Sequence, residues 1–160
     1  MKIISFSAVE ILPKLLNKTK TQTIRRKRRI EQGEEVSLIW HQRSKYKMFC
    51  RRCGRRILKE LGECEFCGDC GMFSKYLGTA EITEVFGIIL GKNSISVENL
   101  KHKWRFFNFD SEKGLLSSRI MKDLAERDGF ENSFELFKWL DINHGLDKPQ
   151  KFTVYRFKWL

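Results

Sequence analysis

The spacing of apolar and polar residues predicts several short strands and short helices. Ser7 followed three residues later by Glu10 forms a capping-box pattern, which predicts a short helix through about Leu16. Segments with a strand-like period of two, or rich in β-branched residues, are residues 2–7, 21–25, 36–40 and 78–90, the last as one long or two short strands.

The C-terminal part of the chain predicts two helices and a closing strand. Ser117 or Ser118 can cap a helix that Gly129 ends, and Asn132 with Glu135 can cap another. Residues 152–159 alternate in a strand pattern with aromatic residues on one face. Residues 99–116 match neither pattern well enough for an assignment.

These elements predict an α+β fold with five or six strands and two to four helices. The alternation of strands and helices that builds a parallel sheet is absent, so a small mixed β-barrel with short flanking helices is the expected architecture. Residues 41–75 lose the regular pattern and are polar and basic. We therefore expect one domain, residues 1–160, interrupted by an insertion at residues 41–75 that resembles a zinc ribbon.

The net charge of +11 is concentrated in one part of the 160-residue chain. Residues 14–59 hold 16 Lys or Arg and three acidic residues, whereas the rest of the chain has a net charge of −2. Such a block is self-repulsive unless an anion binds it, and RNA or another single-stranded nucleic acid is the leading candidate, ahead of a solvated basic face. The predicted contact residues are Arg25, Arg26, Arg28, Arg29, Arg43, Arg51, Arg52, Arg55 and Arg56, with Tyr46 as a base-stacking residue.

All five cysteines lie within 21 residues, in two C-x-x-C pairs followed by glycine. Two such pairs about a dozen residues apart are typical of a four-thiolate structural zinc site. Two sets of four ligands, here called registers, are possible. Both contain Cys50, Cys53 and Cys67, and the fourth thiolate comes from Cys70 in one set and from Cys64 in the other. The sequence has no H-x-E or Pro-Cys-x-x-Cys pattern of a zinc deaminase, which favours a structural ion.

Several segments, in order, resemble the ASCH (activating signal cointegrator homology) family of PUA-like β-barrels. The resemblance implies a barrel with a cleft for RNA or a modified nucleoside; some members hydrolyse the acetyl amide of N4-acetylcytidine, and some have been assigned ribonuclease activity. The matching segments are residues 17–25 (NKTKTQTIR), 33–36 (GEEV), 77–85 (LGTAEITEV), 124–130 (LAERDGF) and 154–159 (VYRFKW).

The resemblance also implies a catalytic set for the amidohydrolase branch. Its lysine and threonine fall on Lys20 and Thr23, and its glutamate falls on Asp128, a shorter acid. Residues three apart on an ideal strand point to opposite faces, so Lys20 and Thr23 converge only if the chain bends between them. RNA binding is therefore the first prediction; an RNA-directed hydrolase and a protein-interaction adaptor are the alternatives.

Targeting and membrane signals are not found in the sequence. No run of 18 apolar residues occurs, and the first residues are too short for the apolar core of a signal peptide. We expect a soluble cytoplasmic protein without a membrane partner.

Overall fold

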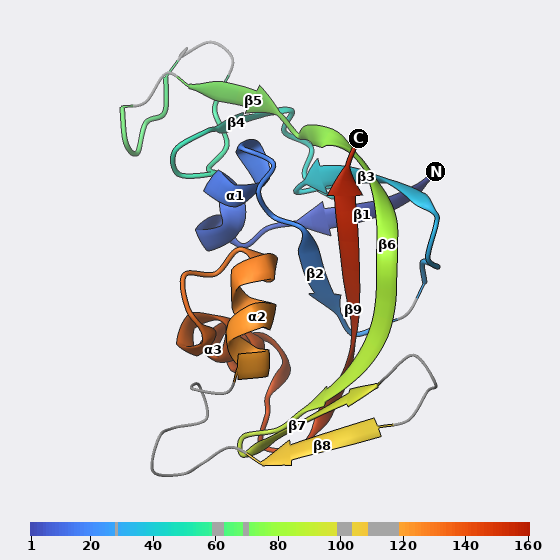
Figure 1. Cartoon of the computed structure of the whole chain (residues 1–160). Coiled ribbons are helices and arrows are strands. Elements are labelled where there is room, and N and C mark those ends of the chain that lie inside the picture. Colours follow the sequence, from blue (N-terminus) through green and yellow to red (C-terminus); the bar gives the residue numbers. More distant parts are fainter. Residues whose placement is uncertain (28, 59–62, 69–70, 99–103, 109–118) are drawn as a thin grey trace. The chain divides into compact units, whose positions relative to one another are not determined.

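The computed structural model describes residues 1–27, 29–58, 63–68, 71–98 and 119–160, and the backbone of residues 104–108 (Figure 1). These residues form two compact units, and each is described separately. The knuckle unit comprises residues 1–20, 35–81 and 158–160. The helical unit comprises residues 21–34 and 82–157.

The knuckle unit is built on three paired strands. Strand β3 (Glu35–Trp40) pairs in parallel with β1 (Lys2–Phe6) and antiparallel with the first part of β6 (Tyr76–Leu90). A short 3-10 turn, η1 (Val9–Ile11), leads into helix α1 (Leu12–Leu16), and β4 (Met48–Cys50) pairs with β5 (Met72–Ser74). Residues of β1, α1 and β3 supply its buried core: Ile4, Phe6, Leu12, Leu15, Val36, Leu38 and Trp40.

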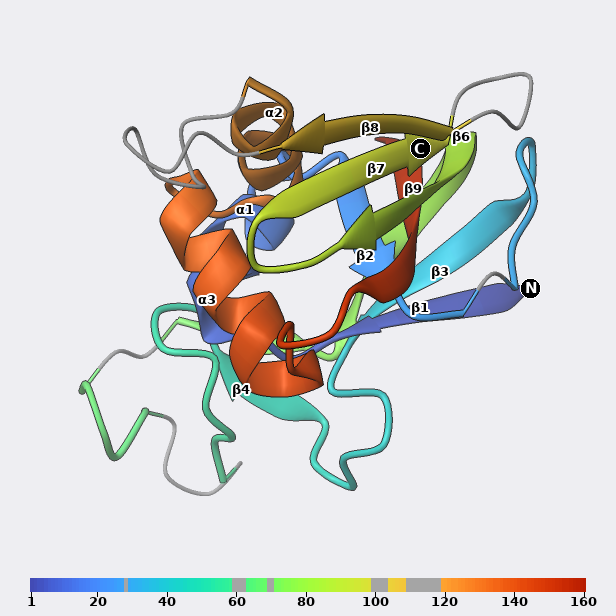
Figure 2. The ribbon, with the colours of Figure 1, turned by 90° about the horizontal axis from the view of Figure 1, so that it is seen from below.

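The helical unit combines two helices with antiparallel strands. Strand β9 (Gln150–Trp159) pairs with β2 (Gln22–Arg25), and the second part of β6 pairs with β7 (Ser94–Glu98), which pairs in turn with β8 (Trp104–Asn108) (Figure 2). Helix α2 (Arg119–Asp128) contacts both β2 and helix α3 (Ser133–His144). The buried residues include Ile24, Met121, Leu124, Leu136, Leu140, Phe152 and Val154.

The mixed α+β class predicted from the sequence is confirmed, whereas the barrel stays a prediction. The strands follow the order β1-β3-β6-β7-β8, with β9 pairing both β6 and β2. Among the described strands no pairing joins β8 back to β1, so closure into a barrel is not seen. No described helix has both the length and the apolar character needed to cross a bilayer.

The predicted helix starts have different outcomes. At α3 the side chain of Asn132 accepts a hydrogen bond from the backbone N–H of Glu135, 3.0 Å between the two atoms, which confirms the predicted cap. The capping box at Ser7 is wrong. Residue Ala8 occupies the capping position of η1, and no side chain caps that turn, because the turn begins one residue later than the pattern requires.

Candidate metal centre and basic surface

Two similar turns of the chain carry the clustered cysteines. In the first, the N–H of Gly54 bonds the carbonyl of Cys50 at 2.9 Å, and in the second the N–H of Gly68 bonds the carbonyl of Cys64 at 2.8 Å. Both glycines have positive φ, 69° and 66°, a conformation that glycine adopts without steric cost. The glycine after each C-x-x-C pair therefore permits the tight turn that brings its two sulfurs together.

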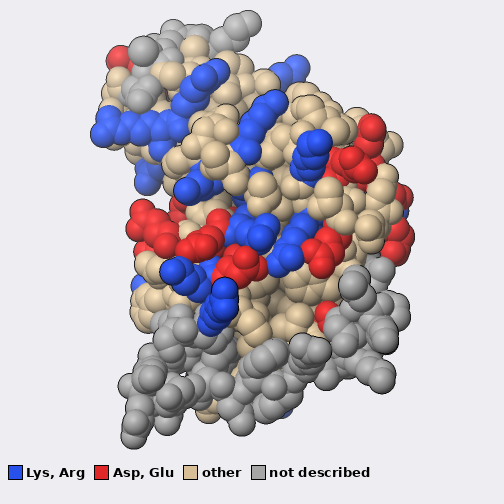
Figure 3. All heavy atoms as spheres, viewed as in Figure 1, with Lys and Arg blue, Asp and Glu red and all other residues tan. Residues whose placement is uncertain are grey.

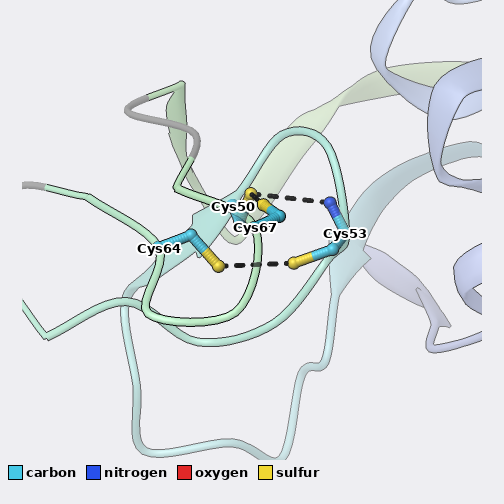
Figure 4. Close-up of side chains that lie close together, drawn as sticks. All are labelled: Cys50, Cys53, Cys64 and Cys67. Carbon is cyan, nitrogen blue, oxygen red and sulfur yellow. Dashed lines mark hydrogen bonds between the residues drawn. The ribbon is translucent and has the colours of Figure 1, made fainter.

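The four sulfurs of Cys50, Cys53, Cys64 and Cys67 lie within 4.8 Å of one another, and none is in a disulfide (Figure 4). The Sγ atoms are 3.4 Å apart between Cys53 and Cys64 and 3.5 Å apart between Cys50 and Cys67. Tetrahedral zinc with Zn–S bonds of about 2.3 Å separates its sulfurs by about 3.8 Å, so the donor set fits this ion. Of the two predicted registers, the structure assembles the one with Cys64; Cys70 lies outside the described residues.

Backbone N–H groups also point at the sulfurs, as they do around metal-bound thiolates. The N–H of Arg52 lies 3.3 Å from the Sγ of Cys50. Hydrogen bonds from the backbone of Phe66 and, more weakly, of Cys67 lower the pKa of the Cys64 thiol to about 7. Burial, followed by hydrogen bonds with the neighbouring thiols, raises the pKa of Cys53 to about 12. A divalent cation would favour the deprotonated form of all four.

The apolar core beneath the two turns is small. Buried Ile57 packs with Cys50 and Cys64, and Met72 covers this cluster in part. The first turn is also attached to the strands of the knuckle unit, because the indole Nε1 of Trp40 bonds the carbonyl of Gly54 at 3.2 Å. So few apolar side chains contribute little burial energy, which is consistent with a stabilising ion.

Basic side chains cover the same segment. Residues 41–58 contain seven Lys or Arg and no acidic residue, and all seven basic residues are exposed: Arg43, Lys45, Lys47, Arg51, Arg52, Arg55 and Arg56. Within the described part of the chain, none of the seven forms an ion pair with a carboxylate. Figure 3 shows mostly basic side chains over β4 and β5 on the face in view.

The other predicted basic residues belong to the helical unit. Arg25 is partly buried with its guanidinium near Asp128; burial lowers the pKa of Arg25, and the Asp128 charge acts in the opposite direction. Arg26 is exposed and donates a hydrogen bond to the Gln150 side chain at 3.0 Å. Arg29 is exposed, and Arg28 lies outside the described residues. One surface shared by both basic groups stays a prediction.

Two aromatic side chains lie beside cations in this segment, and base stacking by Tyr46 stays a prediction. Tyr46 is half-buried, with the guanidinium of Arg56 at 4.4 Å and the ammonium of Lys45 at 5.5 Å from its ring centroid. Phe66, which the sequence reasoning missed, is 60% exposed. Its position inside the second C-x-x-C pair was the available signal, because short metal-bound turns leave such side chains outside the core.

The proposed catalytic residues are nearly closed to solvent. Lys20, Thr23 and Asp128 have exposed fractions of 0%, 4% and 6%. Lys20, in the knuckle unit, places its ammonium 5.6 Å from the ring centroid of Phe6. Thr23 and Asp128 belong to the helical unit, where Thr23 pairs with Tyr155 across β2 and β9. Little surface is left for a substrate to reach, so hydrolysis stays a prediction of the family resemblance.

Comparison with known proteins gives no relative: no family model, no curated protein and no solved structure matches this chain. Membership of the ASCH family is therefore a prediction from the sequence motifs.

Proposed function

We propose that this protein binds RNA through the basic segment of the knuckle unit, residues 41–58, held in shape by a structural zinc on Cys50, Cys53, Cys64 and Cys67. The observation that carries the proposal is the set of seven exposed basic side chains without a carboxylate partner in the described residues. The resemblance to the ASCH family, whose barrels have a cleft for RNA, supports the same ligand class.

The zinc centre itself does not account for this excess of charge. Residues 41–75 carry nine basic and four acidic residues, a net charge of +5. One zinc ion with four thiolates has a formal charge of about −2, which offsets less than half of that excess. The remaining positive charge favours a polyanion, since each phosphate that it neutralises releases a condensed counterion.

The role of zinc in this proposal is structural. All four protein ligands are thiolates, and a four-thiolate set leaves no open position for a substrate or water. The chain supplies the geometry: two glycine-ended turns present the sulfurs, and backbone N–H groups face them. When zinc orders residues 41–58, the arginines of the first cysteine turn are held in fixed positions.

Binding is tested by fluorescence anisotropy of the zinc-loaded protein with a labelled single-stranded RNA at several salt concentrations. We expect Arg52→Gln to weaken binding and to reduce the magnitude of the slope of log K against log salt by about 0.7, because one phosphate contact is lost on a single strand. Lys138→Gln is the matched control, since Lys138 is an exposed cation on α3 of the helical unit without an ion pair in the described residues.

The proposal fails if the wild type shows no salt-dependent binding to RNA. It also fails if an acidic peptide of equal charge competes as well as RNA does, which is the result expected of a protein-interaction adaptor.

A further inference from the structure

Phe66 is a large apolar residue whose side chain lies mostly in solvent. It is the third residue of the turn between Cys64 and Cys67, and it is 60% exposed although Cys64, two residues earlier, is buried. Its backbone is held by the hydrogen bond from Gly68 to Cys64 and by the contact of its own N–H with the Cys64 sulfur. The ring is therefore presented to solvent on a rigid turn.

A flat cation already covers part of this ring. The guanidinium of Arg55 lies 4.0 Å from the ring centroid of Phe66, a distance typical of a stacked cation–π pair. Arg55 is exposed and has no carboxylate partner among the described residues, so its charge remains available to a phosphate. Arg55 follows the first cysteine turn and Phe66 lies in the second, so the pair is positioned by the same metal centre.

A second pair in the knuckle unit has the same chemistry and a different setting. Arg56 lies over Tyr46, but Tyr46 is half-buried, Lys45 also lies over its ring, and its hydroxyl accepts a hydrogen bond from Arg56. The ring of Tyr46 is thus engaged by the protein's own cations. Phe66 therefore leaves more of its ring surface open to another planar group than Tyr46 does.

We infer that Phe66 and Arg55 form a stacking site for an unpaired nucleobase, with Arg55 placed to contact the adjoining phosphate. The inference rests on the proposed RNA binding and makes it more specific, since it selects single strands. Every base has a π face that can stack on an aromatic ring, and in a duplex both faces are covered by neighbouring bases. Phosphate contacts by the arginines would occur with either form.

The test compares a single-stranded oligouridylate, whose bases stack little on one another, with an RNA duplex, using zinc-loaded protein. Phe66→Leu keeps the apolar bulk and removes the π face. We expect it to weaken single-strand binding by about 5- to 150-fold, the range that corresponds to loss of one stacked base. Duplex affinity and the salt slope are expected to stay the same, and Phe66→Tyr is expected to retain single-strand binding. Phe134→Leu is the matched control and should change the preference little, because Phe134 is a 56% exposed aromatic residue on α3 of the helical unit, outside the proposed binding segment.

A direct readout uses 2-aminopurine, a fluorescent base that is quenched when it stacks. The fluorescence of an oligouridylate carrying one such base should be quenched by the wild type and by Phe66→Tyr, and much less by Phe66→Leu. Zinc content and thermal unfolding of each variant separate loss of stacking from loss of the fold.

The inference is overturned if Phe66→Leu weakens single-strand and duplex binding equally, or changes neither. Should that variant fail to hold zinc, the wild-type measurement decides: binding to the single strand without quenching at any labelled position overturns the stacking site. The absence of salt-dependent binding to both RNAs would instead refute the proposed function, so the two failures are distinguishable.

Discussion

The indole Nε1 of Trp40 donates a hydrogen bond to the carbonyl oxygen of Gly54, with 3.2 Å between the two atoms. Trp40 ends β3 and is fully buried, whereas Gly54 closes the first cysteine turn. A Cβ built at Gly54 would lie 3.0 Å from Leu12 Cδ2 and 3.0 Å from Trp40 Cζ2. The first turn is thus packed directly onto the core of the knuckle unit.

Replacing Gly54 should therefore cost more than replacing its counterpart Gly68. Both glycines have positive φ, so alanine at either position costs about 1 kcal/mol or somewhat more. Only Gly54→Ala also creates overlap in a packed core, which adds about 1–3 kcal/mol, because no described residue has an atom within 4 Å of the Cβ position at Gly68. Urea unfolding of the two zinc-saturated variants measures the difference. Equal losses would mean that the first turn can move away from Trp40.

The choice between the two cysteine registers can be tested by metal content. Cys64→Ser should abolish stoichiometric zinc binding, because Cys64 is one of the four thiols within 4.8 Å of one another. Cys70→Ser is the matched control and should keep one zinc per chain. Both variants are purified without chelator and their zinc is quantified by atomic absorption. The opposite pattern, with zinc kept in Cys64→Ser and lost in Cys70→Ser, would establish the other register.

Protonation of His41 should make the protein less stable in mild acid. The His41 ring stacks on Phe49, 5.5 Å between centroids, and burial lowers the pKa of His41 below its ordinary value of 6.5. The unfolded chain then binds a proton more readily than the folded chain does. The stability due to neutral His41 is complete above about pH 6.5 and is lost as the pH falls from there towards the lower pKa of the folded state.

Urea unfolding at pH 7.5 and pH 5.5 checks this contribution. His41→Gln should lose less stability between these pH values than the wild type does, while Gln42→Asn, at the exposed neighbouring position, should follow the wild type. Burial also lowers the pKa of His144, which is present in both variants. His144 therefore accounts for part of the stability that His41→Gln still loses as the pH falls. If His41→Gln loses as much unfolding free energy between pH 7.5 and pH 5.5 as the wild type does, His41 can be protonated in the folded protein without cost.

Arg156 on β9 holds the polar contacts of the helical unit together. Its guanidinium bonds Glu84 at 2.8 Å and Asp123 at 2.9 Å, and its side chain is 26% exposed. We expect Arg156→Gln to destabilise the protein by about 1–3 kcal/mol, the range for hydrogen bonds to charged groups that are partly shielded from water. In contrast, Lys122→Gln breaks only an exposed helical pair with Glu126 and should cost about 0.5 kcal/mol or less.

Chemical denaturation at pH 7 measures both variants. A loss for Arg156→Gln as small as that for Lys122→Gln would show that water replaces the two contacts at Glu84 and Asp123 without penalty.

Local patterns in the sequence predicted much of the fold. The strand patterns of residues 2–7, 21–25 and 36–40 agree with β1, β2 and β3, and residues 78–90 form most of the single strand β6. Residues 94–98 alternate polar and apolar, but the segment is so short that β7 went unassigned. The cap at Asn132 was identified because both partners lie in one turn of helix. Strand periodicity and helix caps involve residues close together in the chain, and the number of residues between them determines how their side chains lie.

The sequence predicted the first C-x-x-C-Gly turn, the basic segment that contains it, and the α+β class, because each follows from short-range spacing or composition. It left the second cysteine pair open between residues 64–67 and 67–70. Among the described residues, only the fold shows that Cys64 lies with Cys50, Cys53 and Cys67, that the basic side chains of residues 41–58 have no carboxylate partner, and that Phe66 is exposed while Tyr46 is half-buried. These outcomes depend on which residues distant in the chain pack together, and burial is a property of that packing.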